Sequence, residues 1–350
     1  MPGMTYLDAN ASEPLRPEAR AAVLAALDVT GNPASVHAAG RAARRVLEDA
    51  RAVVAQRFGA ATVVWTSGGT EADAQAVAGL GAGRRVIVGA TEHDAVAAAA
   101  PGAAVIPVNG DGVADLGWLE RALQAGPPSL VCLMLANNET GTLQPVAAAA
   151  ALCRAHGALL HVDAVQARDG ADLRALGAHS MAVSSHKLGG LKGAGALLLA
   201  EGVEVPPLIV GGGQERGRRG GTPPLPAIAG FAAAAACPWP DLRPLRDAVA
   251  ERAVACGAVL LGGPNRLSNT ACLARPGLRA DMQVIALDLA GVQVSAGAAC
   301  SSGKVGRSRV LDAMGAGALA GEAVRVSLPW SAGWDDVERF AAAYAGVGRR

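Results

Sequence analysis

The feature that most constrains the fold is a regular alternation of short apolar runs with helical segments between residues 62 and 187. Such alternation is typical of βαβ units. Because parallel strands need long crossover connections, the order predicts an α/β protein with a mostly parallel sheet covered by helices on both faces. The predicted strands are Thr62–Thr66, Arg85–Gly89, Ala103–Val108, Leu130–Ala136, Ala158–Val162 and the run that leads into Lys187.

Helical patterns separate these strands, and a smaller α+β part follows them. The longest amphipathic pattern is residues 38–58, and shorter ones cover residues 71–80 and 145–156. After Phe231 the composition changes, and the proline-rich stretch Pro238-Trp239-Pro240 predicts a domain boundary. Beyond it we predict helices over 247–255, 282–290 and 335–344, with short strands at 292–295 and 323–327.

Charge and cysteine usage exclude several classes of protein. The net charge of +1 in 350 residues gives no basic surface for nucleic acid or for an anionic membrane. The N-terminus lacks a signal-peptide pattern, and no apolar run is long enough to span a bilayer. Six cysteines without a CxxC pair predict free thiols in a reducing cytoplasm and no metal site.

Polar residues follow four of the predicted strands, namely Ser67, Asn138, Asp163 and Lys187. In parallel sheets ligands bind beyond the carboxyl ends of the strands, so these residues predict a site. Lysine is rare in this chain, which contains Lys187, Lys192 and Lys304 and otherwise uses arginine. A lysine whose pKa is lowered can form a Schiff base, which arginine cannot do.

Three of these features together match the needs of pyridoxal phosphate. Lys187 can be a surface lysine or a covalent anchor, and Asp163 can be a helix cap or the anion that holds a pyridinium proton. Gly69-Thr70 can be an ordinary helix start or a phosphate cradle. A cofactor site needs a lysine, a carboxylate and a cradle in one βαβ frame, and the sequence supplies all three.

Four further features have both a structural and a chemical interpretation. His93 can be a polar cap or a group that stacks on a cofactor and transfers protons, and residues 211–222 can be a flexible basic loop or an anion clamp. Cys300, flanked by small residues, can be structural or a nucleophilic thiolate near Lys304 and Arg307. Arg325 can be a surface residue or a bidentate ligand of a substrate carboxylate.

Ordered motifs along nearly the whole chain resemble those of the pyridoxal-phosphate-dependent cysteine desulfurases, within the class V aminotransferases of fold type I. The motifs begin at Tyr6, Gly31, Thr66, Thr91, Asn137, His161, Ser184, Gly211 and Gly297. The resemblance implies a large domain of residues 13–236 with a seven-stranded type of sheet. It also implies a small domain, of residues 1–12 and 237–350, that carries the cysteine loop.

The resemblance also implies a role for each matching residue. Lys187 would join the cofactor covalently, Asp163 would hold the ring nitrogen, and His93 would stack on the ring. Gln166 and Asn138 would lie near the ring hydroxyl, while Arg325, with Asn138, would hold the substrate carboxylate. The phosphate ligands would be Gly69, Thr70, Ser184 and His186, with Thr222 reaching the cofactor of a partner subunit.

The implied activity is conversion of L-cysteine to L-alanine by a homodimer, with the sulfur held as a persulfide on Cys300 and passed to an acceptor or scaffold protein. The product would be an iron–sulfur cluster or another sulfur compound. The segment after Cys300, residues 304–308, departs from the family's leucine-glutamate-proline pattern, so the resemblance does not identify the acceptor. The alternatives are a selenocysteine lyase, an aminotransferase, and a catalytically silent assembly partner; Lys187, Asp163 and Cys300 favour the desulfurase.

Overall fold

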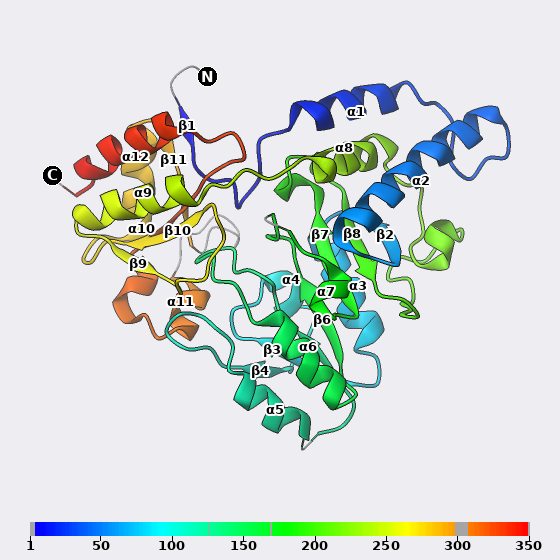
Figure 1. Cartoon of the computed structure of the whole chain (residues 1–350), viewed down its shortest axis with the longest axis horizontal. Coiled ribbons are helices and arrows are strands. Elements are labelled where there is room, and N and C mark those ends of the chain that lie inside the picture. The colour runs from blue at the N-terminus through cyan, green and yellow to red at the C-terminus, as the bar shows by residue number, and fades with distance from the viewer. Residues whose placement is uncertain (1–3, 125, 169, 298–306, 349–350) are drawn as a thin grey trace.

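The computed structural model describes residues 4–124, 126–168, 170–297 and 307–348. Its larger part is built on one sheet with the strand order β2-β8-β7-β6-β5-β3-β4 (Figure 1). Strand β8 runs antiparallel to both neighbours, and the other pairs are parallel, so the predicted mostly parallel sheet is confirmed. The strands are β2 (Thr62–Thr66), β3 (Arg85–Gly89), β4 (Ala104–Ile106), β5 (Ser129–Cys132), β6 (Leu159–Asp163), β7 (Ser180–Ser184) and β8 (Gly195–Leu199).

Helices cover both faces of this sheet, because successive strand residues point to opposite sides and both sides are apolar. One face packs on α3 (Gly69–Leu80) and α4 (Asp94–Ala97) through residues such as Val64, Leu130 and Ala182. The opposite face packs against a larger core. Its helices are α1 (Pro17–Leu27), α2 (Ala38–Phe58), α5 (Leu116–Gln124), α6 (Val146–Ala155), α7 (Leu173–Leu176) and α8 (Leu225–Ala236).

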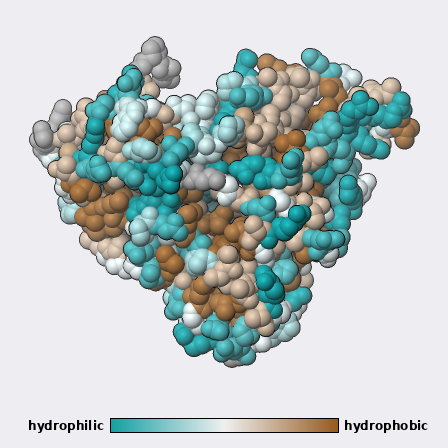
Figure 2. All heavy atoms as spheres, viewed as in Figure 1, coloured by the Kyte–Doolittle hydropathy of each residue, from teal (hydrophilic) through white to brown (hydrophobic). Residues whose placement is uncertain are grey.

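Helix α2 has the bounds that its amphipathic pattern predicts. Its buried stripe includes Leu47, Val54 and Phe58, and the helix is capped by Gly59, whose φ of 63° suits glycine. The rest of the helix is mostly exposed, and Figure 2 shows hydrophilic atoms along this arm at the upper right. Charged residues therefore keep the long helix in water on one side while its apolar stripe joins the core.

A smaller part of the chain has its own sheet and core. Strands β12 (Ser295–Ala296), β13 (Ala323–Ser327), β10 (Thr270–Ala274) and β9 (Val259–Leu261) form an antiparallel sheet in that order. The N-terminal strand β1 (Thr5–Tyr6) pairs with β11 (Val292–Gln293) rather than with the large sheet. Both chain ends therefore lie on this side of the molecule (Figure 1). The helices here are α9 (Arg243–Ala255), α10 (Ala280–Leu289), α11 (Arg309–Ala313) and α12 (Trp334–Gly346).

We propose that the domain division follows these cores, with residues 13–236 in the large domain and residues 1–12 and 237–350 in the small one. Leu7 belongs to the same apolar cluster as Leu273 and Phe340, which supports placing the N-terminus with the C-terminal part. None of the helices among the described residues is long and apolar enough to cross a membrane.

Several element bounds differ from the sequence-based predictions. The strand predicted over 130–136 ends at Cys132, although Leu133 and Leu135 still donate backbone hydrogen bonds to β6. The predicted strand 103–108 is shortened to Ala104–Ile106, and the predicted helix 247–255 begins earlier, at Arg243. Pro244 at the first turn explains that earlier start, because proline fits the first helical positions.

Candidate active site

The candidate site lies at the carboxyl edge of the large sheet. Strand β6 ends at Asp163, and β7 ends at Ser184 and continues into the single 3₁₀ turn η1 (Ser185–Lys187). Strand β2 leads through a loop into α3 at Gly69, and β3 leads to His93, which caps α4. Because these strands run in the same direction, their ends meet at one edge, and the structure brings together the residues predicted from separate motifs.

Lys187 is held against the N-terminal segment. Its Nζ donates hydrogen bonds to the carbonyl oxygens of Asn10 at 2.5 Å and Ala11 at 3.1 Å. The charge of Lys187 also acts on Asp163. Burial raises the pKa of Asp163, and the Val165 N–H, His93 and Lys187 oppose this shift. Lysine, histidine and aspartate therefore share one electrostatic environment at the end of β6.

Asp163 has a fixed orientation and few partners. Its Oδ1 accepts a hydrogen bond from the Val165 amide at 2.9 Å, and the side chain is buried. Gln166, one turn further, donates from Nε2 to the Asn10 carbonyl at 3.1 Å. The Oε1 of Gln166 is buried and has no hydrogen-bond partner among the described residues. A buried acceptor without a donor is costly, so this atom fits a ligand hydroxyl.

The start of α3 is shaped for an anion. A Cβ at Gly69 would lie 2.5 Å from Cγ2 of Val165 and 3.7 Å from Cβ of Ser184, so only glycine permits this close approach. The cap position Gly68 provides no side chain, and Thr70 is exposed in the first turn. The amides of this helix start can therefore bind a phosphate.

His186 and Ser184 flank this cradle on the lysine side. The His186 ring lies 3.3 Å from the Ser12 hydroxyl, and burial, followed by Lys187 and other cations, lowers its pKa to about 4. His186 is therefore neutral at pH 7 and can accept or donate a hydrogen bond without adding charge. Ser184 is buried at the end of β7.

Asn138 and Arg325 join the two parts of the molecule at the site. Arg325 is buried on β13, donates to the Asn138 carbonyl at 3.1 Å and pairs with Asp8 at 2.6 Å. Its Nε has no hydrogen-bond partner among the described residues. A buried guanidinium with an unused N–H suits a carboxylate ligand.

Thr222 lines a pocket beside the loop that leads into α3. Thr222 is exposed and lines a pocket of about 230 Å³ with Thr66, Ser67 and Arg219. Cys300 lies outside the described residues. Two described residues near this segment, Gly297 and Ser308, lie close to Glu139. The Ser308 hydroxyl donates a hydrogen bond to Oε2 of Glu139 at 2.5 Å, and a Cβ added at Gly297 would lie 2.4 Å from the same oxygen.

Burial raises the pKa of Glu139 to about 7, although Ser308, Arg325 and Arg309 oppose the shift and Asp94 adds to it. A carboxyl group with a raised folded-state pKa favours the folded state at low pH, and this contribution is lost as pH rises from about 5 to 7. We expect the wild-type free energy of unfolding to fall between pH 5 and pH 8, and Glu139→Gln to reduce the fall by as much as about 3 kcal/mol. Urea unfolding at both pH values measures this, with the exposed Glu120→Gln as control. An equal fall in all three proteins would contradict it.

Sequence reasoning missed the residue that connects these groups, Asn10. Its carbonyl accepts from Lys187 and Gln166, and its side chain contacts Asn138, Arg168 and Thr270. Arg168, also unassigned before, is buried, pairs with Glu13 at 3.3 Å and donates to the Lys187 carbonyl at 3.0 Å. The motif at residues 6–11 contains Asn10, but these contacts depend on the tertiary fold.

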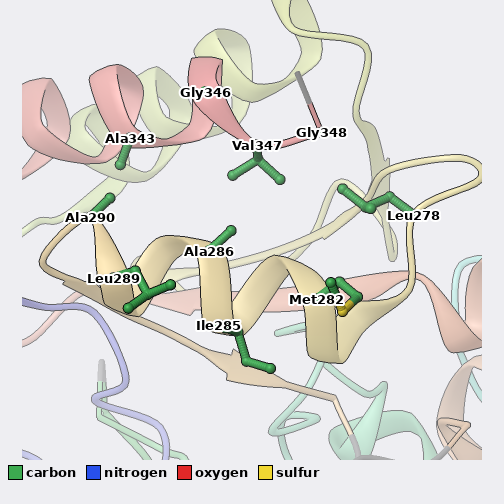
Figure 3. A pocket seen from close by; sticks show the side chains of 10 residues that line it. All are labelled: Leu278, Met282, Ile285, Ala286, Leu289, Ala290, Ala343, Gly346, Val347 and Gly348. Atoms are coloured by element: carbon green, nitrogen blue, oxygen red, sulfur yellow. The ribbon is translucent and has the colours of Figure 1, made fainter. Parts of the chain in front are cut away.

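A larger apolar pocket lies away from this polar cluster. It has a volume of about 490 Å³ between α10 and the end of α12, and Met282, Ile285 and Val347 are among the residues that line it (Figure 3). None of its lining side chains is titratable. The chemistry therefore belongs to the sheet edge and not to this pocket.

Comparison with known proteins gives one consistent family. The family model described as "Aminotransferase class-V" matches residues 5–340. A protein called "Cysteine desulfurase" from Cereibacter sphaeroides is 42% identical over 88% of this chain and 86% of that protein. An "IscS-like cysteine desulfurase" from Mycobacterium tuberculosis is 38% identical over 96% of this chain and 93% of that protein. The solved structure of a NifS-like protein from Rickettsia africae has a TM-score of 0.91 at 30% identity, covering 98% of this chain and 99% of its own.

Proposed function

The chain belongs to the class V aminotransferase family, and on this premise we propose that it is a cysteine desulfurase that converts L-cysteine to L-alanine. The family uses pyridoxal 5′-phosphate. The observation that carries the proposal is the meeting of Lys187, Asp163 and the start of α3 at one sheet edge. That arrangement provides an amine, a carboxylate and an anion cradle in the same site.

The residues present fit the cofactor. Lys187 would bind it covalently, Asp163 would hold the ring nitrogen and His93 would stack on the ring. The unpaired buried Oε1 of Gln166, with Asn138 nearby, would accept from the ring hydroxyl. The phosphate would be bound by Gly69, Thr70, Ser184 and His186. When bound, the cofactor withdraws electrons from the substrate and weakens its carbon–sulfur bond.

The protein's own groups would bind the substrate and remove its sulfur. Arg325, with its unused Nε–H, and Asn138 would hold the carboxylate of L-cysteine. The thiolate of Cys300 would attack the substrate sulfur, forming a sulfur–sulfur bond as the carbon–sulfur bond breaks. The electron pair would return to the substrate carbon, which takes up a proton and leaves as alanine. His93 would move protons beside the ring.

We also propose a second subunit and a sulfur acceptor as partners of the chain. The active form would be a homodimer in which Thr222 reaches the cofactor of the second subunit; the exposure of Thr222, Leu208 and Val210 supports this. The persulfide sulfur would pass to an acceptor or scaffold protein, for iron–sulfur clusters or another sulfur-containing product. A reducing cytoplasm would suit the free thiols of the five described cysteines.

One assay tests the central proposal. The purified protein, loaded with pyridoxal phosphate, is incubated with L-cysteine and a reductant, and we expect sulfide and alanine in equal amounts. L-selenocysteine, and L-alanine with a keto acid, are run as alternative substrates. A yellow protein that yields neither sulfide nor alanine from L-cysteine would refute the desulfurase, and preferred turnover of an alternative substrate would replace it with the lyase or the aminotransferase.

A further inference from the structure

The imidazole of His161 lies fully buried between three elements. Its Nε2 is 3.0 Å from Oδ1 of Asp73 on α3, and its Nδ1 is 2.8 Å from Oγ of Ser180 on β7. The exposed fraction of each of these three residues is 1% or less. This face of the sheet is otherwise packed with aliphatic residues such as Val64, Val88 and Leu130. Buried polar groups are costly unless they pair with each other, so the three groups hold their elements together.

Each of these elements also carries a proposed cofactor contact. On α3, Gly69 lies one helical turn before Asp73, so both are on the same face of the helix. On β6, Asp163 follows His161 by two residues and therefore lies on the same side of the strand. On β7, Ser180 begins the strand that leads through Ser184 into Lys187.

We propose that His161 is a positioning residue: through Asp73 and Ser180 it fixes the phosphate cradle, the ring-nitrogen carboxylate and the lysine-bearing strand relative to one another. The inference rests on the proposed function, because these three groups matter together only if one ligand spans them. Cofactor phosphate and ring nitrogen lie at fixed positions in a rigid molecule, so a small rotation of α3 against β6 would weaken binding at both ends.

Burial shifts the pKa values of His161 and Asp73 toward their neutral forms. Burial lowers the pKa of His161 to about 3, so its ring is neutral. Burial, then the nearby Asp163 and Glu92, raises the pKa of Asp73 well above its ordinary value. Both shifts favour the uncharged forms, which are the less costly ones to bury in this apolar face. At Asp163, the Val165 amide, His93 and Lys187 oppose the rise in pKa that burial causes.

The test measures cofactor affinity rather than turnover alone. Apoenzyme variants are titrated with pyridoxal phosphate, and the dissociation constant is read from the visible absorbance. Asp73→Ala leaves Nε2 without its partner, and we expect affinity to fall by about tenfold to a hundredfold, as when an outer-shell partner of a metal ligand is lost. Asp73→Asn should bind close to wild type, because its amide N–H or its amide oxygen pairs with Nε2, whichever tautomer His161 adopts.

A matched control separates positioning from general stability. Val77 lies on the same buried face of α3, one turn further from the cradle. Its replacement by alanine should lower the melting temperature of the apoenzyme without changing cofactor affinity. If Asp73→Ala does not fold, Ser180→Ala replaces it in the test, because it removes only the partner of Nδ1. We expect Ser180→Ala to weaken cofactor binding severalfold. The inference would be overturned if Asp73→Ala and Val77→Ala lost the same cofactor affinity. It would also be overturned if Asp73→Asn bound the cofactor as weakly as Asp73→Ala. Wild-type protein that binds no pyridoxal phosphate would instead refute the proposed function.

Discussion

Replacing Lys187 by alanine is expected to lower alanine formation from L-cysteine by about 10⁴-fold or more, the scale seen when a covalent catalytic group is removed. Lys187 follows β7, the strand that pairs with β6 next to Asp163, at the edge where the covalent attachment of the cofactor is proposed. The variant should also lose covalent attachment itself. Borohydride reduction followed by denaturation should leave the cofactor on wild-type protein and release it from the variant.

Lys192 provides the matched control for this experiment. It lies five residues later and is exposed, and we expect Lys192→Ala to keep both turnover and covalent attachment. A Lys187→Ala protein that still retains the cofactor after borohydride treatment would show that another amine is the anchor. Loss of attachment in both variants would point to a local folding defect around η1 instead.

The fold of the large domain could be predicted from the sequence because its signals are local. Strands β2 and β3 and helix α2 have the bounds that their apolar patterns indicate, since buried strands and amphipathic helices each impose a fixed periodicity. Strand β8 was missed, although Gly195–Leu199 is uniformly buried, because a short apolar run after glycines has no periodicity of its own. Its antiparallel direction depends on the hairpin that joins it to β7.

Some residues of the candidate site could likewise be predicted from local sequence, and others could not. Lys187, Asp163 and Gly69 could be found because each follows a strand, and the carboxyl ends of parallel strands meet. Asn10, Arg168 and the Asp73–His161 pair could not be found this way. The contacts of Asp73 with His161, of Asn10 with Arg168 and of Asn10 with Lys187 join residues 88, 158 and 177 positions apart, so a local pattern does not reveal them.

Replacing Cys300 by alanine is expected to abolish protein-bound persulfide and to lower alanine formation by about 10³-fold or more, while leaving cofactor absorbance unchanged. The described residues that flank the Cys300 segment, Gly297 and Ser308, both meet Glu139, which adjoins the proposed substrate ligand Asn138. Labelling with L-[³⁵S]cysteine without reductant, followed by a non-reducing gel, measures the persulfide.

The half-buried thiol of Cys237 gives the control, since it lies after α8 and burial raises its pKa, which disfavours the thiolate. Cys237→Ala should label like wild type. Cys300→Ser should fail like Cys300→Ala, because a hydroxyl cannot form a persulfide, and this separates a chemical role from one of packing. Label on Cys300→Ala at the wild-type rate would move the nucleophile to another thiol. Unlabelled protein that still forms alanine would mean that the zero-valent sulfur passes directly to a free thiol, such as that of a second L-cysteine, without a protein-bound intermediate.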